Sequence, residues 1–369
     1  MNSLSVLSVA YPFALVRPDT AGGAEQVLCT LDKELTEAGH RSVVIAAKGS
    51  DISGHLIETP LLPCRITSKD KARVWGHVRD ILRGVFSGYG AGEFDIVHMH
   101  GVDFMNYLPP EAPSLPPVLI TLHMWPSVYG TGMYIAGARS NTYFNAVSAT
   151  QAKACNPVPG TVLKPGSMPV IENGAFLSAS VKGHLEQKEE GYALCLGRIC
   201  EEKGFHIALE AAKMAGVPLV IAGEVFQYPE HESYFRRKIL PGLDGIRYKF
   251  VGRVGWVQKT ALIRQALCLL LPSLVEETSS LSAIEALSCG TPVIAFAKGA
   301  LPEIIEQGVT GFMVDGAGGM AHAILKARTI NRQACAAAAL KRASASEMAR
   351  QYTGLYHEII EHKKINDLR

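Results

Sequence analysis

The sequence predicts an α/β protein built from two parallel-sheet units. Short apolar runs rich in β-branched residues alternate with helical patterns along most of the 369 residues, and this alternation is typical of parallel strands joined by helical crossovers. A polar, glycine-containing stretch over residues 174–191 separates two series of such strands. A chain of this length is also expected to hold roughly two to three domains of about 150 residues. We therefore expect two α/β units joined by a linker.

The predicted elements follow in order along the chain. The strands of the first series are LSVLSVA, RSVVIAA, FDIVHMH, PVLITLH and TYFNAVS. The second series starts near residue 192 and comprises YALCLG, PLVIAG, IRYKFVG, LCLLLPS, TPVIAF and GFMVD. Two helices have apolar residues at the helical spacing: Phe205, Ala208, Leu209 and Ala212 in one, and Met348, Tyr352, Leu355, Tyr356 and Ile359 in the last. The last helix must cover an apolar surface.

Composition and charge argue against several classes of protein. With 48% hydrophobic and 19% charged residues, the chain has the composition of a globular enzyme. The net charge of +2 does not indicate a nucleic-acid or polyanion binder. The apolar N-terminal run lacks a basic leader, and about 18 uncharged apolar residues never run together, so we expect neither a signal peptide nor a membrane span. We expect a cytoplasmic protein.

The potential metal ligands do not form a recognisable site. None of the ten aspartates lies two positions from another, so an Asp-x-Asp pair that could hold a divalent metal is absent. His98 and His100 alternate on one strand face and could suggest a metal, but without a nearby third ligand a packing role is favoured. The eight cysteines lack C-x-x-C spacing and are interpreted as reduced core residues: Cys29, Cys64, Cys155, Cys195, Cys200, Cys268, Cys289 and Cys335. We expect no metal and no cofactor.

Two glutamates stand out in the stretch EETSSLSAIEALSCG, residues 276–290. The run before it predicts a central strand that ends at Pro272, and SSLSAIEALSCG predicts a helix that Gly290 and Pro292 terminate. Glu277 is then in the strand-to-helix turn. Glu285 is on a helix whose other side chains are small and apolar, which predicts a buried carboxylate or one at the wall of a cleft.

A buried glutamate needs either a cation or a hydrogen-bonding ligand, because leaving it alone costs several kcal/mol. The carboxyl end of a parallel strand followed by a helix N-terminus suits a phosphate, and Ser279, Ser280 and Leu281 are placed to donate hydrogen bonds to it. The two carboxylates suit sugar or ribose hydroxyls instead. The alternative is that Glu285 pairs with a core arginine and that Glu277 is a helix-start charge.

Two cations match these carboxylates. LGRICEEKGF places Arg198 just after a strand and Lys203 near the start of the next helix, where two cations could neutralise a diphosphate. This neutralisation would replace a metal ion. The alternative is that both residues are ordinary solvated loop charges.

These residues together resemble the donor-binding core of family 4 retaining glycosyltransferases with the GT-B fold. The resemblance rests on R-x4-K-G starting at Arg198 and on E-x7-E starting at Glu277, with PS before it and CGTPVIA after it. Motifs in the first half follow the order of that family: TAGGAEQVL (20–28), FDIVHMHG (94–101), ITLH (120–123), NAVS (145–148) and VIENGAF (170–176). The resemblance covers about residues 1–315 and the final helix. It departs at Ser279 and Ser280, where the family commonly has an aromatic residue and a glycine.

The resemblance implies two Rossmann-like domains that face each other across a cleft. The first, 1–175, would bind the acceptor, and helix 346–369 would cross back to pack on it. The second, 176–345, would bind the nucleotide sugar.

The resemblance also implies roles for single residues. Arg198 and Lys203 would bind the donor diphosphate, Glu285 the ribose hydroxyls and Glu277 the hydroxyls of the transferred sugar. His123 would lie near the reacting sugar and the acceptor. The backbone around Arg253 and Val254 would face the base, and the Gly22-Gly23 loop would let the backbone approach the donor.

The implied reaction is metal-independent transfer of a hexosyl group, with retention of anomeric configuration, from a UDP- or GDP-linked donor. The acceptor would be a hydroxyl of a carbohydrate, a lipid-linked molecule or a small molecule. A nucleotide-sugar epimerase or a sugar phosphorylase of the same fold is the alternative enzyme. A two-domain sugar-binding protein is a more distant alternative, and an oxidoreductase is weaker still because no G-x-G-x-x-G follows the first strand.

A basic amphipathic helix is predicted over residues 67–86. It could contact an anionic membrane or a lipid-linked acceptor. The plainer alternative is a surface helix that packs on the first sheet.

Overall fold

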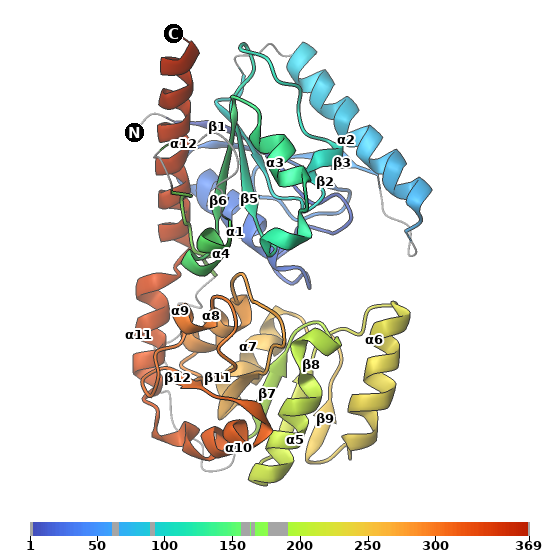
Figure 1. Cartoon of the computed structure of the whole chain (residues 1–369), viewed down its shortest axis with the longest axis vertical. Helices are drawn as coiled ribbons and strands as arrows, with labels where there is room; N and C mark the ends of the chain where they lie inside the picture. The colour runs from blue at the N-terminus through green and yellow to red at the C-terminus, as the bar shows by residue number, and fades with distance from the viewer. Residues whose placement is uncertain are drawn as a thin grey trace. The chain divides into compact units, whose positions relative to one another are not determined.

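The computed structural model describes residues 3–60, 66–88, 93–155, 163, 167–175 and 191–367. Residues 176–190, most of the predicted linker, lie outside the described residues. The chain divides into two compact units, Met1–Gly174 together with Ala345–Arg369, and Ala175–Ser344 (Figure 1). We call them unit 1 and unit 2.

Unit 1 contains a six-stranded parallel sheet in the order β3-β2-β1-β4-β5-β6. The strands are β1 (Ser5–Val9), β2 (Arg41–Ala47), β3 (His55–Thr59), β4 (Ile96–Met99), β5 (Val118–Leu122) and β6 (Thr142–Ala146). Five of them match the predicted runs. The sequence did not reveal β3, because HLIET is a short, partly exposed edge strand with a charged residue near its end.

Unit 1 also contains helices and short helical turns. They are α1 (Gly23–Glu37), α2 (Ser68–Gly88), α3 (Gly132–Gly137), α4 (Ala149–Ala154) and α12 (Ala345–Asp367), with single turns at η1 (Phe104–Asn106) and η2 (Pro126–Val128). The apolar stripe of α2 is buried in the core of the unit. It consists of Val74, Val78, Leu82 and Val85. The structure therefore favours the plainer interpretation of this helix, since its apolar face packs on its own unit and its basic residues face solvent.

The last helix belongs to unit 1, although about 200 residues of sequence separate it from the sheet. α12 packs beside α1 (Figure 1), and Met348, Tyr352, Tyr356 and Ile359 are buried. The predicted return of this helix to the first unit is confirmed.

Unit 2 repeats the architecture with a second six-stranded parallel sheet in the order β12-β11-β10-β7-β8-β9. Its strands are β7 (Ala193–Leu196), β8 (Leu219–Ala222), β9 (Tyr248–Phe250), β10 (Cys268–Leu271), β11 (Val293–Ala295) and β12 (Gly311–Met313). All six match predicted runs. The predicted α/β fold with two parallel sheets is confirmed.

The helices of unit 2 pack on both faces of its sheet. They are α5 (Phe205–Ala215), α6 (Pro229–Tyr234), α7 (Trp256–Gln265), α8 (Leu281–Ser288), α9 (Leu301–Ile304), α10 (Gly316–Lys326) and α11 (Arg332–Arg342). Shorter helical turns are η4 (Glu201–Lys203), η5 (Phe235–Ile239), η6 (Leu240–Gly242) and η7 (Ala327–Thr329). In the described part of the chain, every helix is too short or too polar to cross a membrane.

Candidate active site

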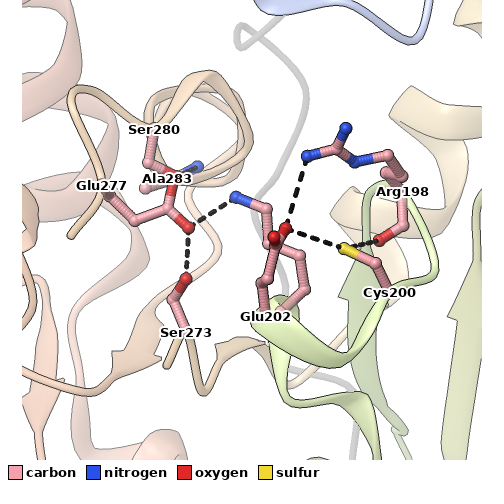
Figure 2. Close-up of polar contacts among 8 residues, drawn as sticks. Arg198, Cys200, Glu202, Ser273, Glu277, Ser280 and Ala283 are labelled. Atoms are coloured by element: carbon pink, nitrogen blue, oxygen red, sulfur yellow. Dashed lines mark hydrogen bonds and ion pairs between the residues drawn. The ribbon is translucent and has the colours of Figure 1, made fainter. Parts of the chain in front are cut away.

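Two neighbouring strands of unit 2 bring Lys203 to Glu277. β7 and β10 are paired in parallel, with Ala193 opposite Cys268, so the turns that follow them lie at the same edge of the sheet. The Nζ atom of Lys203 lies 2.5 Å from Oε1 of Glu277, and the Ser273 hydroxyl donates to the same oxygen (Figure 2). The cation and the carboxylate that are predicted to share a ligand therefore neutralise each other.

Two glycines allow these turns to approach each other. Gly204 has a φ of +65°, and a Cβ on it would lie 2.1 Å from the carbonyl oxygen of Pro272. Gly299 has a φ of +57°, and a Cβ there would lie 2.1 Å from the carbonyl oxygen of Glu277. Only glycine combines this backbone conformation with so little space, so both positions keep the backbone around Glu277 tightly packed.

Arg198 lies on the other side of the β7 turn. Its Nη2 atom is 3.6 Å from Oε2 of Glu202, and the Cys200 thiol lies beside the same carboxylate (Figure 2). The guanidinium is partly exposed. Arg198 and Lys203 thus flank one turn at the carboxyl edge of the sheet, each held by a glutamate that a stronger anionic ligand could replace.

The N-terminus of α8 lies at the same edge. Ser280 is its N-cap residue, and the side-chain oxygen accepts from the amide of Ala283 at 3.3 Å. Ser279 and Leu281 on either side are partly exposed, and the first turn of the helix carries no acidic side chain. The partial positive charge of this terminus is therefore not cancelled locally, and such a terminus favours an anion.

Glu285 is paired with a lysine that the sequence analysis missed. Its Oε1 atom lies 2.6 Å from Nζ of Lys259, and the two side chains are 9% and 14% exposed. Burial raises the pKa of the Glu285 carboxyl, and Lys259 opposes that rise. Lys259 also lies over the ring of Trp256, at 4.7 Å from its centroid. The partner expected as a core arginine is therefore a lysine of α7.

Arg253 and Val254 follow β9 at the same edge of the sheet. Nη1 of Arg253 lies 3.6 Å from Oε2 of Glu224, and Val254 packs on the apolar cluster between the sheet and α8. A Cβ on Gly223, which follows β8, would lie 1.8 Å from the carbonyl oxygen of Gly197. The glycines that follow β7 and β8 therefore leave these strand ends without side chains beside Arg253.

The Gly22-Gly23 loop begins α1 in unit 1. A Cβ on Gly22 would lie 1.8 Å from Oε2 of Glu25, and Glu25 is buried. Burial raises the pKa of the Glu25 carboxyl. Glycine at this position therefore also makes room for a carboxyl group of its own helix, a constraint that the sequence analysis did not reveal.

His123 follows β5, and its surroundings hold it firmly. The side-chain amide of Gln151 donates to the carbonyl oxygens of Leu122 and Met124, both at 2.8 Å, so one residue of α4 clamps the backbone on both sides of His123. The Met124 amide also donates to the Tyr129 hydroxyl at 3.0 Å. Burial lowers the pKa of His123 to about 4, which keeps the ring neutral near pH 7.

His98 and His100 are buried inside unit 1. His98 is hydrogen-bonded to Tyr356 and Thr121, each at 2.7 Å, and His100 to His123 at 3.1 Å. Among the described residues, no group of three or more histidine, cysteine or acidic residues could hold a metal ion. The packing interpretation of these histidines is the one that the geometry favours.

Comparison with known proteins decides the family. A family model for glycosyl transferases group 1 matches residues 179–341, and a model for glycosyltransferase family 4 matches residues 21–158. The chain belongs to glycosyltransferase family 4. The first model matches most of unit 2 and the second most of unit 1.

Curated relatives of this glycosyltransferase include the D-inositol 3-phosphate glycosyltransferase of Mycobacterium tuberculosis, strain H37Rv. The two are 31% identical over 180 residues, which is 48% of this chain and 37% of the relative. The match therefore spans little more than a third of the relative's length.

Solved structures of two other proteins share the fold. Sucrose-phosphate synthase from Thermosynechococcus elongatus superposes with a TM-score of 0.76 at 19% identity, covering 97% of this chain and 100% of that one. HepE from Anabaena, in complex with UDP and glucose, gives a TM-score of 0.72 at 18% identity, covering 95% and 99%. The fold of this glycosyltransferase is accordingly GT-B, with two Rossmann-like units.

Proposed function

We propose that this family 4 glycosyltransferase moves a hexosyl group from a UDP- or GDP-linked donor to an acceptor hydroxyl, with retention of anomeric configuration. The observation that carries the proposal is the pairing of Lys203 with Glu277 beside the N-terminus of α8. A cation and a helix terminus suit a diphosphate, and the neighbouring carboxylate suits sugar hydroxyls. The complex of HepE with UDP and glucose supports this class of donor.

The donor would be held mainly by unit 2. Arg198 and Lys203 bind the diphosphate together with the backbone amides of Ser279, Ser280 and Leu281. Glu285 accepts hydrogen bonds from the ribose, and the backbone at Arg253 and Val254 faces the base. The acceptor would bind to unit 1 near His123, and the Gly22-Gly23 loop of the same unit would let the backbone approach the donor.

Binding of the donor exchanges partners within the site. The diphosphate takes Lys203 from Glu277, and Glu277 is then free to accept hydrogen bonds from the sugar hydroxyls. The lysine keeps an anionic partner through this exchange, because the diphosphate replaces the carboxylate beside it, and the Ser273 hydroxyl still donates to Glu277. A donor without a diphosphate would leave Lys203 on Glu277 and would bind poorly.

The acceptor hydroxyl attacks the anomeric carbon from the face that the diphosphate leaves, so the C–O bond to the acceptor forms as the C–O bond to phosphate breaks. Arg198, Lys203 and the helix terminus stabilise the charge on the departing phosphate. A phosphate oxygen takes the proton of the acceptor. Two fixed cations supply the neutralisation that a divalent metal gives in other transferases, and we propose a metal-independent reaction on that basis.

We also propose a cytoplasmic location. The seven cysteines in the described part of the chain are all buried and free, which fits a reducing compartment.

The decisive experiment screens nucleotide sugars against the full chain by thermal unfolding and then measures transfer. A ligand at 100 times its dissociation constant adds about 2.7 kcal/mol to the free energy of unfolding, so the correct donor should raise the melting temperature clearly. Donor consumption should also depend on an added acceptor. Consumption without acceptor would favour the epimerase, and consumption that depends on phosphate would favour the phosphorylase.

Variants of the two cations test the assigned roles. Arg198→Ala and Lys203→Ala should each lower turnover about 100-fold or more, because loss of one preorganised donor costs roughly 3 kcal/mol. Lys326→Ala, at an exposed position of α10 in the same unit, is the matched control and should keep full turnover. Wild-type rates in both cation variants would overturn the assignment.

A further inference from the structure

His100 is the side chain hydrogen-bonded to His123, and it has no role in the function proposed above. We propose that His100 is a positioning residue that donates its Nδ1–H to Nε2 of His123 and so holds His123 as the Nδ1–H tautomer. The inference rests on the proposed function, which places His123 beside the reacting groups. It assigns His123 the role of a hydrogen-bond donor instead of a base.

A single proton lies between the facing ring nitrogens of His100 and His123. Nδ1 of His100 lies 3.1 Å from Nε2 of His123, and the two ring planes are 23° from parallel with centroids 5.3 Å apart. Burial lowers the pKa of both histidines, so both are neutral near pH 7. One nitrogen of the facing pair must then donate and the other must accept.

The far side of His100 indicates which ring donates. Its Nε2 atom is buried and has no hydrogen-bond partner among the described residues. If His123 were the donor, the proton of His100 would be on this Nε2 atom and would form a buried N–H without an acceptor. Unpaired buried donors are rarer in native proteins than under-used acceptors. The arrangement with Nδ1–H on His100 leaves only an unused acceptor there.

A second histidine keeps the His100 ring in place. His98 lies against it, with ring centroids 3.9 Å apart. The Thr121 hydroxyl donates to Oδ1 of Asn145 at 2.6 Å, so it can only accept from Nε2–H of His98 at 2.7 Å. Nδ1 of His98 consequently accepts from the Tyr356 hydroxyl, and both its nitrogens are used. His98 therefore supports His100 by packing and competes for none of its protons.

The main chain of His123 is fixed independently of its ring. Gln151 and Tyr129 hold the residues on either side through main-chain groups, and these contacts do not involve the imidazole. The hydrogen bond from His100 selects one of the two tautomers of the ring. Because the lone pair of Nε2 is then occupied, His123 cannot remove the acceptor proton through this nitrogen, which agrees with a phosphate oxygen acting as the base.

Side-chain nitrogen NMR on the isotope-labelled full chain tests the tautomer directly. In the wild-type protein near pH 7, Nδ1 of His123 should show the shift of a protonated nitrogen and Nε2 that of a bare one. His123→Gln identifies the signals by their loss. In His100→Leu, the two nitrogens should move toward values that indicate a mixture of tautomers. A wild-type protein with the proton on Nε2 would overturn the inference, and this measurement needs no substrate.

Kinetics test the consequence for the reaction. His100→Leu should lower kcat about 10- to 100-fold, a range known for small misplacements at a reacting centre, with little change in the KM for the donor. His100→Asn can place an amide N–H where Nδ1–H lies, so it should recover most of the loss. His55→Leu, a substitution at an exposed position of β3, is the matched control.

The outcomes separate the inference from the function on which it rests. A chain that transfers no sugar would defeat the proposed function, whereas the NMR result would still decide the tautomer. Wild-type kcat in a folded His100→Leu variant would show that His100 has no positioning role in the reaction. Equal losses in the asparagine and leucine variants would show that the histidine ring serves only to fill space.

Discussion

The Glu285 carboxylate shows how one buried charge determines which residue must lie beside it. It lies on a helix of small and apolar residues, and its compensating cation comes from the neighbouring helix α7. Removing one partner of a buried ion pair leaves an uncompensated charge, which is more costly than losing the attraction between the two. Lys259 therefore stabilises the fold by compensating the buried Glu285 carboxylate.

Lys259→Met should lower the free energy of unfolding by about 3 kcal/mol near neutral pH. Without the lysine, burial raises the pKa of Glu285 further above its ordinary value of 4.5. The folded state then prefers the neutral acid, whereas the unfolded chain ionises. The loss should accordingly grow as the pH rises above about 4.5 and should nearly vanish below it.

Urea unfolding of the ligand-free protein at about pH 5 and about pH 8 measures this effect. The double variant Lys259→Met/Glu285→Leu should recover most of the stability, because two apolar side chains can replace a buried pair. Lys326→Met is the control for loss of an exposed lysine. A loss that is the same at both pH values would mean that Glu285 stays solvated.

Sequence reasoning found some residues of the site and missed others for a physical reason. Lys203 and Glu277 follow strand-to-helix turns, and turns of this kind in neighbouring strands meet at one sheet edge. His100 and His123 also follow paired parallel strands, β4 and β5, whereas Lys259 and Gln151 come from helix positions that no turn or helical repeat connects to their partners. Their contacts depend on how the helices pack in the tertiary structure, and local sequence patterns do not reveal this packing.

At the scale of elements, the turn between β7 and α5 depends on a glycine. Gly204 and Gly216, before and after α5, both have a φ of +65°. They differ in their surroundings, since a Cβ on Gly204 would meet the Pro272 carbonyl while nothing lies within 4 Å of one on Gly216. Comparing substitutions at the two glycines therefore separates the energetic cost of a left-handed backbone from the cost of the close approach between two turns.

Gly216→Ala should cost about 1 kcal/mol for the left-handed conformation alone. Gly204→Ala should cost about 1–3 kcal/mol more, because the added carbon forces the β7 turn away from β10. Thermal unfolding compares the two variants. Nucleotide binding should weaken only in Gly204→Ala, where Lys203 is displaced. Equal stability losses would contradict a close contact at this turn.

Most elements could be predicted because their patterns are local. Eleven of the twelve strands of the two sheets coincide with apolar runs in the sequence, and α8 begins at its serine cap and ends just before Gly290. The edge strand β3 has no continuous apolar run, because only part of it is covered. The π-helical turn η5 (Phe235–Ile239) has no marker in the sequence that the analysis could use.

For the whole molecule, α12 ties the end of the chain to the first sheet. Met348, Tyr352, Tyr356 and Ile359 are buried in unit 1, and each such side chain contributes about 1.5–3 kcal/mol. Together they are comparable with the net stability of a domain, about 5–15 kcal/mol. The helix also supplies the hydroxyls that bond to His98, Thr121 and Asn145.

A chain that ends at Ser344 should therefore lose unit 1 and keep unit 2. Hydrogen exchange followed by mass spectrometry should show loss of protection in β1, β4 and β5, while β7 and β10 remain protected. The control is Glu347→Ala/Arg350→Ala, which removes an exposed ion pair of the same helix and should leave protection unchanged. Full protection of β4 and β5 in the shortened chain would contradict this account.

The late position of α12 has a consequence for synthesis on the ribosome. The strands of the first sheet are complete once Ala146 has been made, but the helix that satisfies their inner polar groups begins at Ala345. At roughly 5–20 residues per second, the nascent chain waits about 10–40 s for it. During that interval the imidazole of His98 and the amide of Asn145 lack their tyrosine partners. The N-terminal part of the nascent chain is then a natural client for chaperones, and slow codons between the two segments would lengthen its exposure.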